Sequence, residues 1–155
     1  MHRRTVLKTL SGGLIGLIVP GLAATSHAAG PTINVYKSAN CGCCEAGVKH
    51  LEENGFAVTA MDVDDPTQYR TKFGVPDALG SCHTGIVAGY ALEGHVPAAD
   101  IKRLLADKPK ARGLAVPGMP LGSPGMEGTR VDPYDVMLIL PDGGHRVYRH
   151  VGSAA

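Results

Sequence analysis

The chain has 155 residues, of which 44% are hydrophobic and 19% are charged, and its formal net charge is +1. This length and apolar content suffice for one domain of ordinary size with a core of its own. The near balance of charges, without any basic run, argues against a nucleic-acid partner.

The first 28 residues have the features of an export signal. "MHRRTVLK" is basic, and "LSGGLIGLIVPGLAA" is apolar but too short and too interrupted to be a comfortable membrane span. Ser26 and Ala28 are the small residues that a signal peptidase accepts, which predicts cleavage after Ala28. Arg3-Arg4 resembles the start of a twin-arginine signal; an ordinary secretory signal and an uncleaved anchor are the alternatives. We expect the mature chain to be a periplasmic monomer without a membrane span.

The first half of the mature chain predicts a strand, a helix and a strand. Alternation in "TINVYKS" (32–38) is typical of a strand, and "CEAGVKHLEENG" (44–55) predicts a helix that ends at Asn-Gly. "FAVTAMDVD" (56–64) predicts a second, largely buried strand. Such a succession within about 30 residues is a right-handed parallel unit. A short helix is expected over 66–74, with proline at its first position.

The second half predicts a hairpin, a helix, a loop and another hairpin. Residues 84–96 hold two short strands or a bent hairpin, and 97–108 is the clearest helix. The segment 112–133 is rich in Gly and Pro, and a loop of that length is usually functional or disordered. Residues 135–151 form two strands around Asp-Gly-Gly, a good hairpin signal.

This order of elements predicts an α/β, thioredoxin-like fold with a central mixed β-sheet flanked by helices. The similarity in order covers roughly residues 32–108. We expect residues 29–155 to form one domain, with 109–155 as a C-terminal extension of loop and hairpin.

"NCGCC" places Cys41, Cys43 and Cys44 at the first strand-to-helix turn of this predicted fold. Four cysteines in an exported protein would normally form two disulfides. Cys41 and Cys44 have the C-x-x-C spacing, in which a helix N-terminus stabilises thiolate. A thiol–disulfide exchanger needs one attacking and one resolving thiol, and a third adjacent sulfur adds wrong pairings. The excess of sulfur therefore favours a metal site.

Cys82 and His83 are expected beside the same turn. In thioredoxin-like domains the residues that enter the third strand, normally with a cis-proline, lie against the cysteine turn, and here "SCHT" takes that place. The arrangement would bring four sulfurs and an imidazole together. Such a cluster of ionised thiols is stable only with cations among them.

Ligand softness indicates which cation fits. Thiolates select Cu(I), Zn(II) or iron–sulfur clusters. Zinc would accept four such ligands, although structural zinc sites usually use two C-x-x-C type pairs. Cu(I) tolerates two and three ligands and lets a thiolate bridge two ions, so copper, as one ion or as a polynuclear group, is favoured over zinc.

The Gly- and Pro-rich loop carries two further candidate ligands. Pro-Gly-Met occurs twice in "VPGMPLGSPGME", which places Met119 and Met126 seven residues apart. A thioether is a weak ligand for zinc and a good one for Cu(I). The alternative is that both methionines fill gaps between the loop and the domain.

The remaining polar candidates have weaker support. His50 lies about two helical turns after the cysteines and is expected to be exposed, and His95 is expected at the surface. His145 and His150 flank the last strand, where alternation puts them on opposite faces. Lys37 would either offset thiolate charge or be solvated.

"CGCC" at the first turn, "CH" before the third strand and the "PGMP.GSPGME" loop together resemble the CopG family of periplasmic copper-resistance proteins. The resemblance runs through nearly all of the mature chain. It implies copper at the cysteine motif, a role in copper tolerance, and a contribution of the C-terminal extension to the metal site. By position, the implied site is Cys41, Cys43, Cys44, Cys82 and His83, with the loop from Met119 to Met126 as a lid.

Three functions follow from these residues. The first is a periplasmic copper-binding protein that holds Cu(I) in a cysteine-rich site and interconverts Cu(I) and Cu(II), with periplasmic copper chaperones or efflux components as partners. The second is a thiol–disulfide oxidoreductase that uses Cys41 and Cys44, a reading that rests on fold analogy. The third is a metal-free module with two disulfides, for instance 41 to 44 and 43 to 82. Whether the copper protein is an enzyme stays open on sequence alone.

Overall fold

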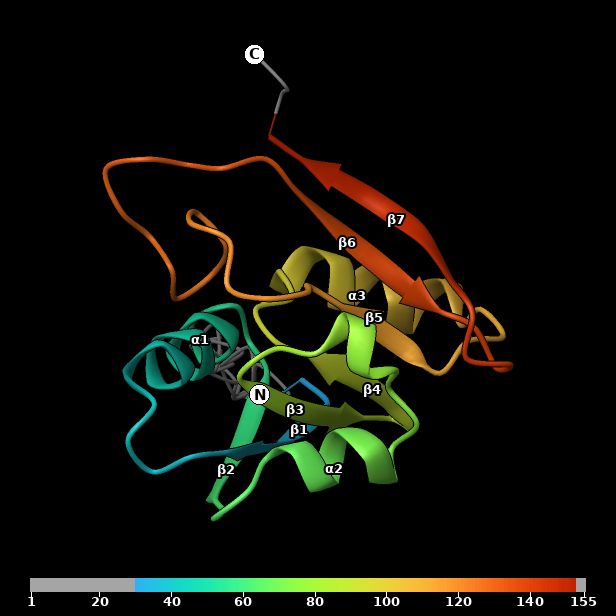
Figure 1. The fold of residues 1–155 in the computed structure, drawn as a ribbon, viewed down its shortest axis with the longest axis horizontal. Helices are drawn as coiled ribbons and strands as arrows, with labels where there is room; N and C mark the ends of the chain where they lie inside the picture. Colours follow the sequence, from blue (N-terminus) through green and yellow to red (C-terminus); the bar gives the residue numbers. More distant parts are fainter. Residues whose placement is uncertain (1–29, 153–155) are drawn as a thin grey trace, which may run out of the picture.

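The computed structural model describes residues 30–152, so the predicted export signal and its cleavage site lie outside the described residues. A single seven-stranded sheet runs through them in the order β2-β1-β3-β4-β5-β6-β7 (Figure 1). The strands are β1 (Thr32–Lys37), β2 (Ala57–Asp62), β3 (His83–Val87), β4 (Tyr90–Glu93), β5 (Gly113–Ala115), β6 (Tyr134–Ile139) and β7 (His145–Val151). The helices are α1 (Gly42–Glu53), α2 (Thr67–Lys72), the 3-10 turn η1 (Asp77–Leu79) and α3 (Ala98–Asp107).

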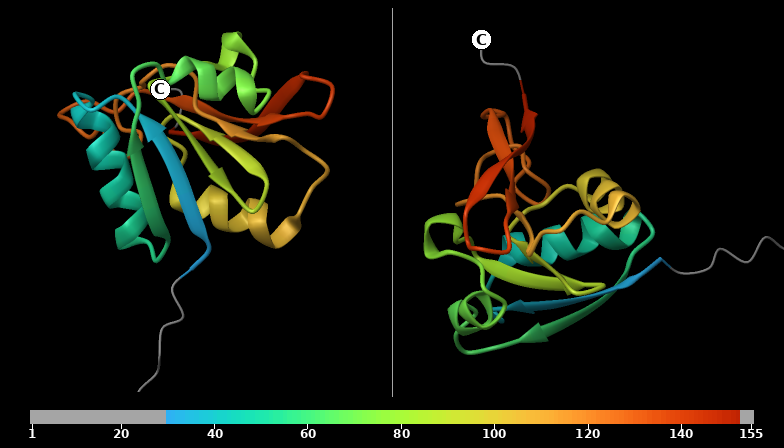
Figure 2. Two further views of the ribbon diagram at one scale, coloured as in Figure 1. Left: turned by 90° about the horizontal axis from the view of Figure 1, so that it is seen from below. Right: turned by 90° about the vertical axis from the view of Figure 1, so that its right-hand side faces the viewer.

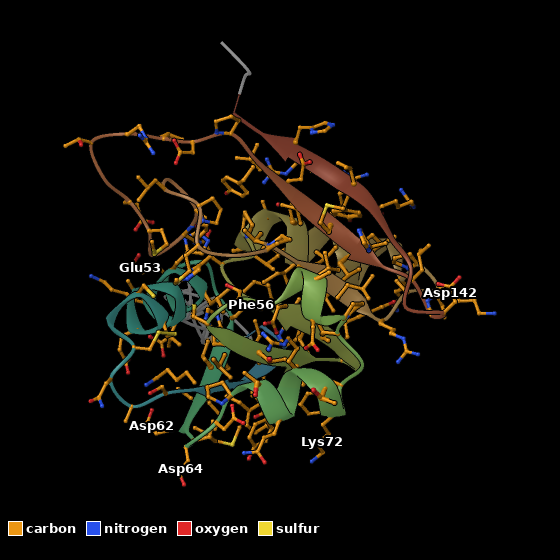
Figure 3. All side chains as sticks on the ribbon, viewed as in Figure 1. Glu53, Phe56, Asp62, Asp64, Lys72 and Asp142 are labelled. Atoms are coloured by element: carbon orange, nitrogen blue, oxygen red, sulfur yellow. A yellow bond between two sulfur atoms is a disulfide. The ribbon has the colours of Figure 1, made fainter. Side chains whose placement is uncertain are left out.

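Helices cover both faces of the sheet. α1 and α3 lie on one face and α2 on the other (Figure 2). Alternation along the strands divides the core accordingly, so that Ile33 and Val35 of β1 pack in the larger cluster with α1 and α3, whereas Ala115 and Ile139 pack in the smaller cluster beside η1. Charged side chains such as Glu53 and Lys72 point outward from the body (Figure 3).

The pairing of β1 and β3 brings two distant segments to one edge of the sheet. β1 runs parallel to β2 but antiparallel to β3, with Lys37 opposite His83. The end of β1, which leads into the cysteine turn, therefore lies beside the start of β3. The β3–β4 hairpin then turns at Ala88 and Gly89, both with positive φ, and returns to the same edge with Thr84 opposite Glu93.

The residues after 109 join the same sheet. β5 pairs parallel to β4, and β6 and β7 follow as an antiparallel hairpin. Leu114, Val136 and Leu138 are fully or almost fully buried in the larger core cluster. Arg149 of β7 makes two hydrogen bonds to the buried Asp100 of α3, which ties the last strand to the helical layer.

The predicted α/β class with a central mixed sheet and flanking helices is confirmed, and its thioredoxin-like assignment stays a prediction. The expectation of a largely buried strand over 56–64 is wrong, because β2 is an edge strand with exposed Thr59 and Ala60. The segment 112–133, predicted to be a loop, begins instead with the strand β5. The buried Leu114 and Ala115 of β5 lie between β4 and β6 in the sheet. Among residues 30–152 no peptide bond is cis, and no helix is long and apolar enough to cross a membrane.

Candidate metal centre

The cysteine turn lies at the N-terminus of α1. Cys41 immediately precedes the helix, and its carbonyl oxygen accepts hydrogen bonds from the N–H groups of Cys44 and Glu45. No side chain caps this end of the helix, so its free N–H groups and the helix dipole favour negative charge on nearby sulfurs. Cys41 and Cys44 form a disulfide, whereas Cys43 and Cys82 are free thiols.

All four sulfurs of the described cysteines lie within 4.8 Å of one another. Cys41 Sγ is 3.5 Å from Cys43 Sγ, and the buried Cys44 Sγ is 3.8 Å from the carbonyl oxygen of Cys82. Cys82 reaches the group because it precedes β3, whose first residue lies opposite the last residue of β1. The structure therefore brings together the four sulfurs that the sequence places in one group.

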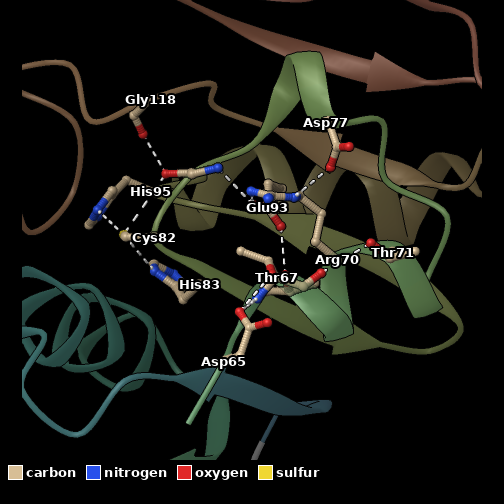
Figure 4. Close-up of polar contacts among 12 residues, drawn as sticks. Asp65, Thr67, Arg70, Thr71, Asp77, Cys82, His83, Glu93, His95 and Gly118 are labelled. Atoms are coloured by element: carbon tan, nitrogen blue, oxygen red, sulfur yellow. Dashed lines mark hydrogen bonds and ion pairs between the residues drawn. The ribbon is translucent and has the colours of Figure 1, made fainter. Parts of the chain in front are cut away.

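Cys82 also belongs to a second group, with two imidazoles. Its Sγ is 3.2 Å from His83 Nδ1 and 3.1 Å from His95 Nε2 (Figure 4). The two rings meet edge to face with their centres 5.1 Å apart. Sγ of Cys82 and one ring nitrogen of each histidine lie within 4.8 Å of one another, so the two groups share one thiol.

The expectation that His95 lies at the surface is wrong, because its side chain is 2% exposed. The β3–β4 pairing explains its position, since continuing the register by two residues from Thr84 and Glu93 places His95 opposite Cys82. A hairpin with a two-residue turn at Ala88-Gly89 pairs the strands in this same register. The Ala-Gly turn was therefore the signal in the sequence from which the position of His95 could have been predicted.

The segment 116–133 covers the second group. Pro124 O lies 2.7 Å from His95 Nδ1, which must carry the proton because a carbonyl only accepts. His95 Nε2 then keeps a lone pair directed at Cys82, the form of imidazole that binds metals. A Cβ on Gly125 would lie 2.7 Å from Cys43 O, so the loop packs directly on the first turn of α1.

Burial sets the protonation states at the site. It raises the pKa of the Cys82 thiol to about 12, with a further contribution from Cys43. Burial also lowers the pKa of His83 to about 3, assisted by His95 and Lys37, and lowers the pKa of His95. Without metal, the site therefore holds neutral imidazoles beside a protonated Cys82.

Lys37 is buried beside the cysteine turn and is not solvated. Its Nζ lies 2.5 Å from both Asp62 Oδ1 and Glu45 Oε1. Hydrogen bonds to Asp62 and then to Glu45 raise the pKa of Lys37, so the ammonium is held in its charged form. The two carboxylates offset this charge, and the β1–β3 register places Lys37 opposite His83, next to the segment that carries Cys82.

A buried carboxylate supports the segment that carries Cys82 and His83. Glu93 is 1% exposed, and its Oε1 and Oε2 accept hydrogen bonds from Ser81 N and Thr84 Oγ1 (Figure 4). Arg70 lies 3.6 Å from the same carboxylate. No motif in the sequence indicated this network.

The other candidate side chains lie in varied surroundings. Met119 is 52% exposed, and Met126 is half-buried in the loop beside Gly125, so their role as ligands stays a prediction. His50 is half-buried, contrary to expectation, because its Nε2 accepts the N–H of Ala98 at the start of α3. His150 is exposed and contacts Asp135 on the neighbouring strand.

Two solved structures resemble the chain over most of its length. They are described as "Copper resistance protein copG- Form 2" and "Copper resistance protein copG- Form 1". Each is 47% identical in sequence with a TM-score of 0.75, and the match covers 79% of this chain and 98% and 99% of theirs. The chain belongs to the CopG family of copper-resistance proteins.

The CopG assignment agrees with a match to a family model described as "Protein of unknown function, DUF411". That match covers residues 79–126, which contain Cys82, both site histidines and both loop methionines. Nothing among the curated proteins matches the chain.

The donor set of this CopG relative fits a soft metal ion. Two sulfurs bound to one ion at about 2.3 Å lie at most about 4.6 Å apart, close to the 4.8 Å within which the four sulfurs gather. Thiolates with neutral imidazoles are the ligands of Cu(I) and Zn(II). Because only free thiolates bind, the Cys41–Cys44 disulfide must be reduced before all four sulfurs can act as ligands.

Proposed function

We propose that this protein binds copper as Cu(I) through Cys41, Cys43, Cys44 and Cys82, with His83 and His95 as further ligands. The observation that carries this function is the convergence of four sulfurs in one group and of Cys82 with two imidazoles in a second, beside the N-terminus of α1. Membership of a family of copper-resistance proteins supports copper as the metal.

Cu(I) suits the site better than zinc. Zinc prefers four ligands arranged as a tetrahedron, whereas Cu(I) accepts two or three and shares thiolates between ions. Here one thiol, Cys82, stands in both groups, and Cys43 follows Cys41 by two residues. Met119 and Met126 on the covering loop would add thioethers that Cu(I) accepts.

The disulfide supports an extension of this function to the interconversion of Cu(I) and Cu(II). Reduced Cys41 and Cys44 can each give one electron to a Cu(II) ion. Two Cu(II) ions then become two Cu(I) ions, two protons leave, and one S–S bond forms. That step would leave the Cys41–Cys44 disulfide that the structure contains, and an external dithiol would restore the thiols.

Anaerobic titration of the reduced protein with Cu(I), against a chromophoric Cu(I) chelator, tests the binding. We expect at least one tightly bound Cu(I) per chain and an affinity about 10-fold lower or worse in Cys82→Ser and Cys43→Ser, as is common for altered metal sites. His145→Ala, on the exposed start of β7, is the control. Binding unchanged in both cysteine variants would contradict the proposal.

The same disulfide favours a second candidate, a thiol–disulfide oxidoreductase that uses Cys41 and Cys44. That enzyme has no use for Cys43 or for the imidazole group. Insulin reduction without copper distinguishes the two functions, because vigorous turnover that survives Cys43→Ser would favour the oxidoreductase.

The periplasm is the proposed location, and copper chaperones or efflux components are the proposed partners. The features of residues 1–28 support export. Cell fractionation of the whole chain, compared with a variant in which Arg3 and Arg4 are both lysine, tests the location and the twin-arginine route together. Recovery of wild-type protein in the cytoplasm would count against export.

A further inference from the structure

Glu93 occupies an unusual position for a charged residue. It ends β4, is 1% exposed, and lies two residues before His95. Placing a carboxylate in a protein interior is unfavourable unless hydrogen bonds and opposite charges compensate for the lost hydration. Glu93 has such compensation from Ser81, Thr84 and Arg70.

The two carboxylate oxygens bracket the Cys82-His83 pair. Oε1 accepts the backbone N–H of Ser81 at 2.7 Å, and Oε2 accepts the hydroxyl of Thr84 at 2.7 Å. These donors stand immediately before and immediately after the two candidate ligands. One rigid group thus fixes both ends of the four-residue segment 81–84.

The backbone around Glu93 reaches the other parts of the site. The N–H of Gly94 donates to His83 O at 2.9 Å, and the carbonyl of Glu93 accepts the N–H of Val116 at 3.0 Å, where the covering loop begins. Ser81 in turn donates its hydroxyl to Gly118 O in that loop. The segment 81–84 and the start of the covering loop therefore both bond to β4 and its continuation at this residue.

We infer that Glu93 is a positioning residue of the metal centre, which holds Cys82 and His83 in the geometry that binds copper. The inference rests on the proposed copper function and deepens it, because it assigns a role to a residue outside the ligand set. Hydrogen-bonding partners of ligands typically change metal affinity by about 10- to 100-fold when they are altered.

Glu93→Gln tests the role with little change of shape. The amide can still accept from Ser81 but loses the charge opposite Arg70. We expect Cu(I) affinity to fall about 10-fold and the sulfur-to-copper absorption band to shift. Thr84→Val, which removes only the bond to Oε2, is expected to act in the same direction more weakly, and it serves as a second test if Glu93→Gln fails to fold.

Asp100→Asn is the matched control. Asp100 is a carboxylate of similar burial, at 2% exposed, and is paired with Arg149. Its loss should lower the stability without shifting the copper band. Equal copper affinity and an unchanged band in Glu93→Gln and Thr84→Val would overturn the inference while leaving the proposed function intact, whereas wild-type protein that binds no Cu(I) would overturn both.

A measurement without copper separates the inference from the proposed function. In a Cys43→Ser background with the Cys41–Cys44 disulfide intact, Cys82 is the one free cysteine of the chain. Its rate of alkylation by iodoacetamide reports how firmly it is held against His83 and His95. We expect this rate to rise severalfold on adding Glu93→Gln and to stay constant on adding Asp100→Asn; the same rate in both would contradict the positioning role.

Discussion

His95 connects two parts of the site through its two ring nitrogens. Nδ1 donates to Pro124 O in the loop, and Nε2 faces Cys82 Sγ. The carbonyl fixes the tautomer, so the lone pair of Nε2 already faces Cys82 Sγ, in the form of the ring that could bind a metal. The exposed His150 of β7 has its Nδ1 against Asp135 and belongs to neither group of possible ligands found among residues 30–152.

His95→Gln tests this contribution. We expect the affinity for Cu(I) to fall about 10-fold or more, because one ligand and the link to the loop are both lost. Competition with a chromophoric chelator measures the change, and His145→Gln is the control. An unchanged affinity would show that the ring only packs against Cys82.

For single residues, the sequence sufficed to predict the group of four cysteines, but not the buried His95 and Glu93 beside it. Cys41, Cys43 and Cys44 are adjacent in the chain, and the order of elements sufficed to bring Cys82 and His83 to them. His95 and Glu93 depend on the register of the β3–β4 hairpin, which is set by the turn at Ala88-Gly89. The expectation that His95 is exposed was based on its neighbours in the sequence, and these do not determine how the two strands pair.

Among the elements, the loop over 116–133 depends on one glycine for its close contact with α1. Gly125 has φ +86, and a Cβ there would lie 2.6 Å from Gly47 N and 2.7 Å from Cys43 O. The neighbouring Pro124 supplies the carbonyl that contacts His95. A side chain at Gly125 must therefore move the loop away from the site.

Gly125→Ala is expected to open the loop, and Gly143→Ala is its control. Gly143 has φ +88 with nothing near its position of a Cβ, so both changes carry the same backbone penalty of about 1 kcal/mol. Urea unfolding should show a larger loss for Gly125→Ala. Only that variant should also release Cu(I) faster to a chelator, and equal release rates would contradict the covering role of the loop.

Most elements were predicted from their periodicity and their ends, whereas the two exceptions have separate causes. β5 has three residues within a Gly- and Pro-rich segment, too few to show alternation. β2 has the composition of a buried strand but lies at the edge of the sheet, and strand order is not written in local pattern. The predicted hairpin over 135–151 is confirmed because its turn has a distinctive sequence.

At the scale of the whole molecule, the stability of the fold should depend on pH through the buried histidines. Burial, then His95 and Lys37, lower the pKa of His83 from 6.5 to about 3. A histidine with a lowered pKa in the folded state contributes fully above pH 6.5, and its contribution is lost as the pH falls from there toward 3. His95 and His50 shift in the same direction.

His83→Gln should therefore reduce the sensitivity of the metal-free protein to acid. Between pH 7 and pH 5 the free energy of unfolding of wild type should fall by about 2 kcal/mol more than that of the variant, because protonation of the unfolded histidine is removed. Urea unfolding at the two pH values measures the difference. Parallel losses in both proteins would show that His83 titrates normally in the folded state.

Cys82 is common to the sulfur group and to the imidazole group, and this shared atom has a consequence for loading. An ion bound by one group would withdraw electron density from the sulfur that the other group also uses. Two ions would therefore enter unequal environments, and a binding isotherm for this protein should depart from that of identical, independent sites.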